Sequence, residues 1–320
     1  MLNRYPDERE SLLSIIIPAK NAEETIARTI DSLSSARSYI GELIIINDGS
    51  TDNTVKVAIA SGQALNVDVQ VHEGGSRGVS AARNIGLSYA KFPLIYFIDA
   101  DDICIASGLI ELILTLSRDR RKDLAVGSAI DNNGTSTSIH KAGTFGIDAI
   151  KNAEAYITYS IPLIRIGSVV VRRELLYNQR FPEGLAYQED GIFWAKVLAK
   201  ATPIAVQHNT VECFSNRARS NLRLTMNHRA KFITLMRAML KLRYDGLSQA
   251  ALYQSIGANA LTLSRKLSEN GNYVVALGYL RLAWHLSNNL GYRTAIIKGT
   301  ARILRDAGTQ LVLGRHAVIE

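Results

Sequence analysis

Short apolar runs rich in Ile and Val alternate with helix-like segments over the first 130 residues, and this alternation restricts the fold more than any other feature. The segments between the runs carry apolar residues at helical spacing, such as Ile26, Ile30 and Leu33 in AEETIARTIDSL. Near-continuous apolar strands joined by crossover helices predict a mainly parallel, Rossmann-like α/β sheet flanked by helices. The predicted strands are LLSIII (12–17), ELIIIN (42–47), VDVQVH (67–72), PLIYFI (93–98) and LAVGSAI (124–130).

The pattern changes twice further along the chain. After residue 131 the stretch DNNGTSTSIHKAGTFG predicts a surface loop or hairpin. A second ordered block follows, with a helix beginning near residue 188 and short strands around PIAVQH and VECFS, and from about Leu224 the pattern is helical. The expected domains are a sheet-based domain over 1–220, with halves of about 12–130 and 131–220, and a basic helical C-terminal region over 221–320.

Composition argues against several classes of protein. The only cysteines, Cys104 and Cys213, lie far apart without a C-x-x-C partner, which argues against a disulfide framework or a cysteine-built metal site. The first ten residues have no apolar signal region, and nowhere do 18 uncharged apolar residues run together, so a cytoplasmic location is expected. Neither a P-loop nor a G-x-G-x-x-G occurs, which argues against ordinary ATPase and NAD chemistry.

Polar residues follow three of the predicted strands. The first strand ends in PAKN (18–21), the second in NDGSTD (47–52) and the fourth in DADD (99–102). Ligands of open parallel sheets bind beyond the carboxyl ends of the strands, so these positions are the expected site. Asp48 has two interpretations, a tight turn before a capped helix or a carboxylate that accepts hydrogen bonds from a ligand.

The cluster of Asp99, Asp101 and Asp102 needs a positive group, because like charges this close repel and raise one another's pKa. The N-terminus of the following helix supplies part of that field. A hard divalent cation is the stronger interpretation, since Mg²⁺ binds one or two protein carboxylates and completes its shell with water and phosphate oxygens. Arg77 and Arg83 in SRGVSAARN are the expected partners of the phosphates.

Four motifs, taken in order, resemble the family 2 glycosyltransferases of the GT-A fold: SIIIPAKNAEETIARTIDSL, ELIIINDGSTDNT, SRGVSAARNIGLSYAKFPLIYFIDADD and QEDGIFW, over about residues 12–217. The resemblance implies a nucleotide-sugar donor, most often a UDP sugar, and transfer with inversion. The length and the basic helical tail also resemble bacterial exopolysaccharide glucosyltransferases of the succinoglycan type, which implies UDP-glucose or a related UDP-hexose. No Q-x-x-R-W motif of processive polymerases occurs, so we expect addition of a single sugar.

The resemblance also divides the donor site among residues. It places Asp99 toward the ribose, Asp101 on the Mg²⁺ or Mn²⁺ that bridges the diphosphate, Asp102 in support and Asp48 on the pyrimidine edge. Lys20 stands where the family often has an aromatic residue, so a hydrogen bond to the base or an approach to the phosphates replaces base stacking. The residues expected to bind the nucleotide sugar are Pro18, Ala19, Lys20, Asn21, Glu23, Asp48, Arg77, Arg83 and Asp99.

Inversion in one displacement requires a base on the acceptor hydroxyl. By analogy with the family's E-D motif we expect Asp190 to be this base and Glu189 to bind the acceptor or orient Asp190. The alternative for both is a favourable charge at a helix N-terminus. Trp194, four residues further on, either stacks on an acceptor sugar or packs in the core.

The basic charge of the chain belongs to its last third. Residues 1–214 carry a net charge of −4 and residues 215–320 one of +12. RAKFITLMRAMLKLR (229–243) predicts an amphipathic helix that lies on anionic lipid or packs against the protein. We expect residues 229–320 to favour the inner face of a plasma membrane, where a lipid-linked saccharide acceptor would be found, and a homo-oligomer is a further expectation. Nucleic acid is not expected, since no recognised binding motif accompanies the charge.

Two other functions fit parts of the pattern. A sugar-nucleotide-forming nucleotidyltransferase would show a Gly-rich loop with Arg and Lys after the first strand, where this chain has PAKNAEE. A non-catalytic nucleotide-sugar binding protein would bind donor without hydrolysis or transfer.

Overall fold

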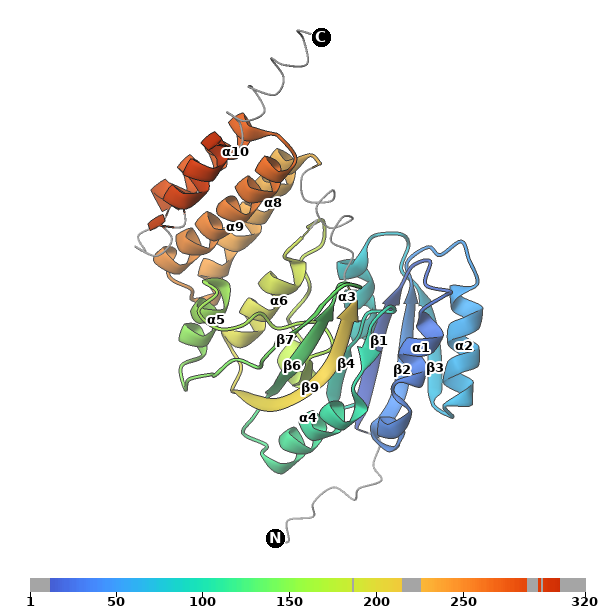
Figure 1. Cartoon of the computed structure of the whole chain (residues 1–320). Helices are drawn as coiled ribbons and strands as arrows, with labels where there is room; N and C mark the ends of the chain where they lie inside the picture. Colours follow the sequence, from blue (N-terminus) through green and yellow to red (C-terminus); the bar gives the residue numbers. More distant parts are fainter. Residues whose placement is uncertain (1–11, 186, 215–225, 287–292, 295, 306–320) are drawn as a thin grey trace, which may run out of the picture. The chain divides into compact units, whose positions relative to one another are not determined.

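Nine strands form one mixed sheet in the computed structural model, which describes residues 12–185, 187–214, 226–286, 293–294 and 296–305 (Figure 1). The chain divides into two units, a sheet unit of residues 1–156 and 160–216 and a helical unit of residues 157–159 and 217–320. The strands are β1 (Leu13–Ala19), β2 (Ile40–Asn47), β3 (Asp68–Glu73), β4 (Leu94–Phe97), β5 (Ile103–Cys104), β6 (Leu124–Asn132), β7 (Thr137–His140), β8 (Val169–Arg172) and β9 (Pro203–Phe214).

The strand order is β3-β2-β1-β4-β8-β6-β9-β5, and β7 pairs with β6. β3, β2, β1 and β4 are mutually parallel, β8 runs antiparallel to both β4 and β6, and β9 is parallel to β6. The predicted α/β sheet is therefore confirmed, as is the hairpin after residue 131. The two short strands expected around PIAVQH and VECFS are instead one strand, β9, with register shifts opposite β6.

Helices cover both faces of the sheet because its strands are apolar on both sides. Ile15 and Ile17 belong to a core layer under α1, α2 and α4, whereas Ile16 faces α3, where an added Cβ on Gly86 would meet it at 2.4 Å. This close approach requires glycine in α3. The helices of the sheet unit are α1 (Ile26–Asp31), η1 (Ser34–Tyr39), α2 (Thr54–Ala64), α3 (Val79–Tyr89), α4 (Ala106–Arg118), α5 (Ala149–Ile157), η2 (Arg173–Leu176) and α6 (Glu189–Leu198).

An aromatic cluster fastens α6 to the sheet. Phe193 stacks on Phe181 with ring centroids 3.7 Å apart, and Phe97 of β4 meets Trp194 edge to face at 6.5 Å. Trp194 is 1% exposed, so the packing interpretation holds and stacking on an acceptor sugar is excluded for this side chain. The large apolar area buried here fixes the N-terminus of α6 relative to β4.

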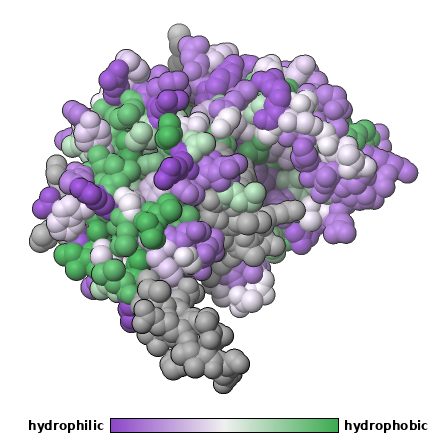
Figure 2. Space-filling view, turned by 90° about the horizontal axis from the view of Figure 1, so that it is seen from above, coloured by the Kyte–Doolittle hydropathy of each residue, from purple (hydrophilic) through white to green (hydrophobic). Residues whose placement is uncertain are grey.

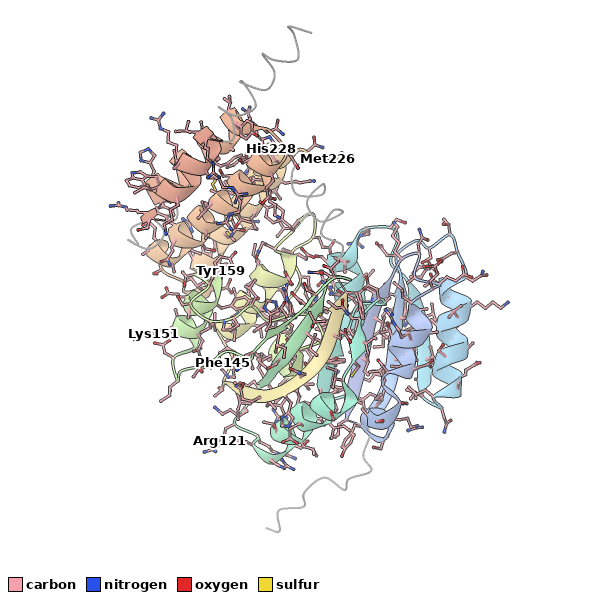
Figure 3. All side chains as sticks on the ribbon, viewed as in Figure 1. Arg121, Phe145, Lys151, Tyr159, Met226 and His228 are labelled. Atoms are coloured by element: carbon pink, nitrogen blue, oxygen red, sulfur yellow. The ribbon has the colours of Figure 1, made fainter. Side chains whose placement is uncertain are left out.

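The helical unit contains α8 (His228–Lys241), η3 (Leu242–Asp245), α9 (Gln249–Glu269) and α10 (Tyr273–Leu286), and residues 296–305 are helical again. Figure 3 marks Met226 and His228 where α8 begins. The apolar stripe of α8 is buried inside this unit: Phe232 packs edge to face on Tyr279, with centroids 5.2 Å apart, and Met239 accepts a hydrogen bond from Ser255. The stripe is therefore used for packing and is not the surface that would meet lipid.

Candidate active site

The loops after β1 and β2 are bonded to each other. Asn21, at φ 50°, donates its backbone N–H to Ser50 Oγ at 3.1 Å and accepts from the Thr51 N–H at 2.9 Å. Both carboxylate oxygens of Glu23 accept from Asn53, at 3.0 and 2.7 Å. The side chains of Asn21 and Glu23 therefore hold the second loop in place. Of the predicted first motif, Pro18 and Ala19 are buried in β1 and Lys20 is exposed.

Asp48 is 5% exposed and fixes the turn before α3. Its two carboxylate oxygens accept the backbone N–H groups of Arg77 and Gly78 at 2.8 and 2.9 Å. The turn is close, because a Cβ on Gly49, at φ 79°, would lie 2.0 Å from Ser76 Oγ. An ionised carboxylate can accept about four hydrogen bonds, so each oxygen of Asp48 can accept one more. A hydrogen bond from a pyrimidine to one of these oxygens stays a prediction.

Side chains of α1 bind the backbone of the DADD turn that follows β4. Thr29 Oγ1 lies 3.0 and 2.8 Å from the carbonyl oxygens of Ala100 and Asp102, and Arg28 Nη2 donates to the Asp101 carbonyl at 3.0 Å. The Arg28 guanidinium also lies over the ring of Phe214, 4.5 Å from its centroid. The sequence did not single out either residue of α1. The available signal was that two adjacent polar residues follow Ile26 and Ala27 in the helix IARTID.

The three carboxylates of the turn have different environments. Asp99 forms an ion pair with Arg83 at 2.6 Å. Asp102 is 5% exposed and accepts from the Phe214 N–H at 3.0 Å; burial, with the charges of Asp99 and Asp101, raises its pKa to about 8. Asp101 is exposed, and the pKa of its carboxyl is raised by partial desolvation and by Asp99. Asp101 therefore presents the most accessible of the three carboxylates of the turn.

This donor set suits a divalent ion that binds together with its substrate. Among the described residues there is no group of three or more His, Cys, Asp or Glu side chains that could enclose a metal. Mg²⁺ needs no such cage, because water and phosphate oxygens usually supply most of its shell. The raised pKa of Asp101 also fits, since a cation at this carboxylate would relieve the repulsion from Asp99.

Arg83 and Arg77, which the sequence left as alternatives for the diphosphate, are placed very differently. Arg83 is 3% exposed, pairs with Asp99 and lies over Phe181, 5.2 Å from the ring centroid. This burial corrects the expectation that Arg83 binds phosphate: its guanidinium is an internal counter-ion. The Arg77 side chain is 57% exposed and pairs with Glu183 at 2.7 Å.

The N-terminus of α6 brings two more carboxylates toward Arg83. Burial alone would lower the pKa of Arg83, but Asp99, with Glu189 and Asp190, raises it above its usual value. Asp190 is half-buried, and its Oδ1 accepts from the N–H of Gly191 at 2.8 Å. Before them Gln188 has φ 62°, a left-handed conformation that ends the preceding loop. Residues 99 and 190, remote in sequence, thus share one electrostatic environment.

A polar cluster at the end of β6 was not predicted. Asp131 Oδ2 accepts from Arg165 Nη2 and lies 2.9 Å from His140 Nε2. Asp131 is paired in register with Cys213 of β9, the residue before Phe214. His140 looked isolated in sequence, and only the β6–β7 hairpin brings it to the carboxylate.

Both thiols of the chain lie near the DADD turn. Burial raises the pKa of Cys104, beside Tyr96, to about 12. Burial, and then the negative charge of Asp102, raises the pKa of Cys213 as well. Both raised pKa values favour the protonated thiol at neutral pH.

Comparison with known proteins shows the family to which this chain belongs. Residues 14–179 match the family model described as Glycosyl transferase family 2. The chain belongs to this family.

Two curated relatives are similar over about three fifths of this chain. The succinoglycan biosynthesis protein ExoU of Rhizobium meliloti is 34% identical over 211 residues, 61% of this chain and 59% of its own length. The Escherichia coli UDP-Glc:alpha-D-GlcNAc-diphosphoundecaprenol beta-1,3-glucosyltransferase WfgD is 32% identical over 192 residues, 58% of this chain and 70% of its own. The alignments leave more than a third of this chain unmatched, so these activities are not transferred directly.

Solved structures confirm the GT-A fold. The crystal structure of S. aureus TarS 1-349 in complex with UDP-GlcNAc aligns with a TM-score of 0.65 at 17% identity, over 93% of this chain and 92% of that one. Glucosyl-3-phosphoglycerate synthase from Mycobacterium tuberculosis, in complex with Mn²⁺, UDP and phosphoglyceric acid, aligns with a TM-score of 0.50 at 21% identity, over 75% and 80%. At these identities the likeness concerns the fold.

Proposed function

We propose that the chain is an inverting, metal-dependent glycosyltransferase that moves one sugar from a nucleotide-diphosphate sugar, UDP-glucose or a related UDP-hexose, to a saccharide acceptor. The observation that carries the proposal is the convergence of the DADD turn and the α6 carboxylates on Arg83. The same edge of the sheet then offers a carboxylate for a metal-bound diphosphate and a second carboxylate for the acceptor. ExoU and WfgD, by their names, support a role in exopolysaccharide or other cell-surface glycan assembly.

The proposed reaction breaks one bond and forms another. The acceptor hydroxyl oxygen attacks the anomeric carbon, its proton passes to Asp190, and the bond to the diphosphate oxygen breaks on the opposite face. A Mg²⁺ or Mn²⁺ at Asp101 would stabilise the negative charge of the departing diphosphate. Arg77 has an exposed guanidinium at this edge, and Glu183 holds it until a phosphate competes.

Glu189 and Asp99 complete the proposed division of roles. Glu189 is placed beside Asp190 at the start of α6, where it would contact the acceptor. Asp99, fixed by Arg83, keeps one side accessible for the ribose, since its side chain is 34% exposed. Both roles follow from position and charge, and neither requires movement of the sheet.

A metal-supplemented screen of nucleotide sugars tests the donor. UDP-glucose with Mn²⁺ should bind and be hydrolysed slowly, and EDTA should abolish the hydrolysis. Donor binding without any hydrolysis or transfer would favour the non-catalytic alternative. Release of pyrophosphate from a nucleoside triphosphate and a sugar phosphate would favour the nucleotidyltransferase.

We also propose that the acceptor is lipid-linked and that residues 229–320 attract the enzyme to an anionic membrane surface. No helix among the described residues has both the length and the apolarity needed to cross a bilayer. Trp284, Ile297 and Leu304 of the helical unit are 39%, 59% and 57% exposed. Figure 2 shows a hydrophobic area where this unit lies. Exposed aromatic and aliphatic side chains beside basic ones suit the interfacial region of a bilayer.

Sedimentation with vesicles tests this partner. Vesicles containing phosphatidylglycerol should bind the protein. Salt at 0.5 M should release most of it, because the Debye length falls to about 4 Å and the attraction is screened. Trp284→Ser should weaken binding without changing donor hydrolysis. Self-association through the same face would instead appear as a dimer in sedimentation equilibrium without vesicles, and absence of any salt-sensitive binding would remove the membrane proposal.

A further inference from the structure

A cavity lies at the edge of the sheet opposite the DADD turn. Its volume is about 480 Å³, and it is bordered by Leu12 before β1, Leu94 at the start of β4 and Arg172 at the end of β8. The donor loops follow the other ends of β1 and β4. The cavity is therefore separate from the proposed reaction, and its volume lies within the range of small-molecule sites.

Two arginines of this cavity are held by backbone carbonyls. Arg172 donates from Nε to the Lys122 carbonyl at 2.8 Å and from Nη2 to the Leu116 carbonyl at 2.6 Å. Arg173 donates from Nη1 to the Ala90 carbonyl at 3.1 Å. Carbonyl oxygens orient a guanidinium without neutralising its charge. Both cations are consequently fixed in place, and neither has an ion-pair partner among the residues that the structure describes.

The third arginine, Arg120, differs from its neighbours in the segment SRDRRK. Arg118 pairs with Glu111 at 3.5 Å, and Arg121 pairs with Asp119 at 2.9 Å. Arg120 lines the cavity and has no carboxylate partner within the described part of the chain. Glu174, which is exposed, is the one acidic residue among those that line the cavity. Three guanidinium groups and one carboxylate leave a net positive cavity.

The rest of the lining is apolar or aromatic. Leu12, Leu94 and Leu116 border the cavity, and Tyr177, 62% exposed, lies under the Arg173 guanidinium, 5.8 Å from it. Guanidinium groups bind phosphate through charge-assisted, bidentate hydrogen bonds. An aromatic ring and leucines would instead contact the body of a ligand. The two kinds of lining together suit a ligand that has both a phosphate and an apolar or aromatic part.

We propose that this cavity is a second binding site, specific for a small organic phosphate. Arg120 and Arg173 bind its phosphate, and Arg172 adds to the positive electrostatic potential. The organic part of the ligand lies against Tyr177 and the leucines. This site goes beyond the proposed transfer reaction and does not depend on it. Nothing in the DADD turn or at α6 takes part in it.

Calorimetry with adenosine monophosphate and, separately, inorganic phosphate tests the site in the full-length protein. We expect AMP to bind more tightly than inorganic phosphate, and saturating UDP with Mn²⁺ to leave AMP binding unchanged. Arg120→Gln combined with Arg173→Gln should weaken AMP binding by at least about tenfold. Donor hydrolysis should stay at the wild-type rate.

The matched control is Arg118→Gln combined with Arg121→Gln, which also removes two positive charges, both from the segment that contains Arg120. Figure 3 shows Arg121 at the periphery of the sheet unit, beside the end of α4. This control should bind AMP like the wild type, and Arg120→Gln alone, at an exposed position, tests the site without a risk to folding. Equal losses in the two double variants, competition by UDP, or inorganic phosphate bound as tightly as AMP would each overturn the proposal.

Discussion

The two edges of the sheet collect opposite charges and manage them differently. At the donor edge, one carboxylate of the DADD turn is paired with a buried arginine, one is buried with a raised pKa, and Asp101 is exposed. At the opposite edge, Arg172 and Arg173 are held by carbonyls that leave their charges uncompensated. The difference shows that an ion pair fixes a charge and cancels it, whereas a carbonyl fixes a charge and leaves it available.

The largest expected effect tests the donor edge as a catalytic one. Asp190→Asn keeps the size of the side chain but cannot accept the acceptor proton, so transfer should fall by about 10²- to 10⁴-fold while donor affinity stays near the wild type. Initial rates and donor titration measure both quantities. Asp148→Asn is the matched control, because Asp148 also accepts a backbone N–H at the start of a helix, from Lys151 at 3.1 Å. Turnover at the wild-type rate in Asp190→Asn would remove this residue as base.

A second prediction separates buried from exposed ion pairs at that edge. Arg83→Met leaves Asp99, whose side chain is 34% exposed, without its counter-ion and should lower the free energy of unfolding by about 2–3 kcal/mol. Arg77→Met removes an exposed pair with Glu183 and should cost less than about 1 kcal/mol. Urea denaturation of both variants measures the contrast. Equal losses would mean that burial of Arg83 is not what distinguishes the two arginines.

A third prediction concerns Asp101, the exposed carboxylate of the DADD turn. Asp101→Ala should weaken Mn²⁺-dependent donor binding by about tenfold or more, and EDTA should weaken binding to the wild type by a similar factor. The two treatments should not add, because both remove the same metal. Calorimetry with UDP in the presence and absence of Mn²⁺ is the measurement, and additive losses would place the metal elsewhere.

The smallest effect lies in the helical unit and depends on pH. Burial, and then Arg229, lowers the pKa of His228, whose Nδ1 lies 3.1 Å from the Tyr279 hydroxyl. The unfolded chain therefore binds a proton more readily, and stability should decrease slightly as pH falls through about 6.5 toward the folded pKa. His228→Gln should flatten this dependence. Thermal denaturation at pH 5.5 and 7.5 would show it, and a dependence unchanged in the variant would contradict it.

The strands, the polar residues that follow them and the family could be predicted from the sequence, because apolar periodicity and local motifs are short-range signals. Asp101 and Asp190 were proposed on these grounds. The role of Arg83 could not be predicted, because its position in SAARN is the same whether its side chain faces phosphate or Asp99. Only the burial of the side chain distinguishes these two roles. Trp194 failed as an acceptor contact for the same reason. The pairing of His140 with Asp131, and the cavity arginines, depend on strand pairings that leave no local trace.

Cys104 is buried and Cys213 is partly buried, so the reactivity of the two thiols depends on whether the strands that carry them are paired. Burial raises the pKa of Cys104 to about 12 and also raises the pKa of Cys213, so both are weak nucleophiles at neutral pH while β5 and β9 are paired. At reagent concentrations at which alkylation is faster than re-pairing of the strands, alkylating reagents would modify the protein at the rate at which this pair of strands opens. Iodoacetamide uptake, followed by mass spectrometry, would therefore time the opening of the sheet next to the DADD turn without an engineered label.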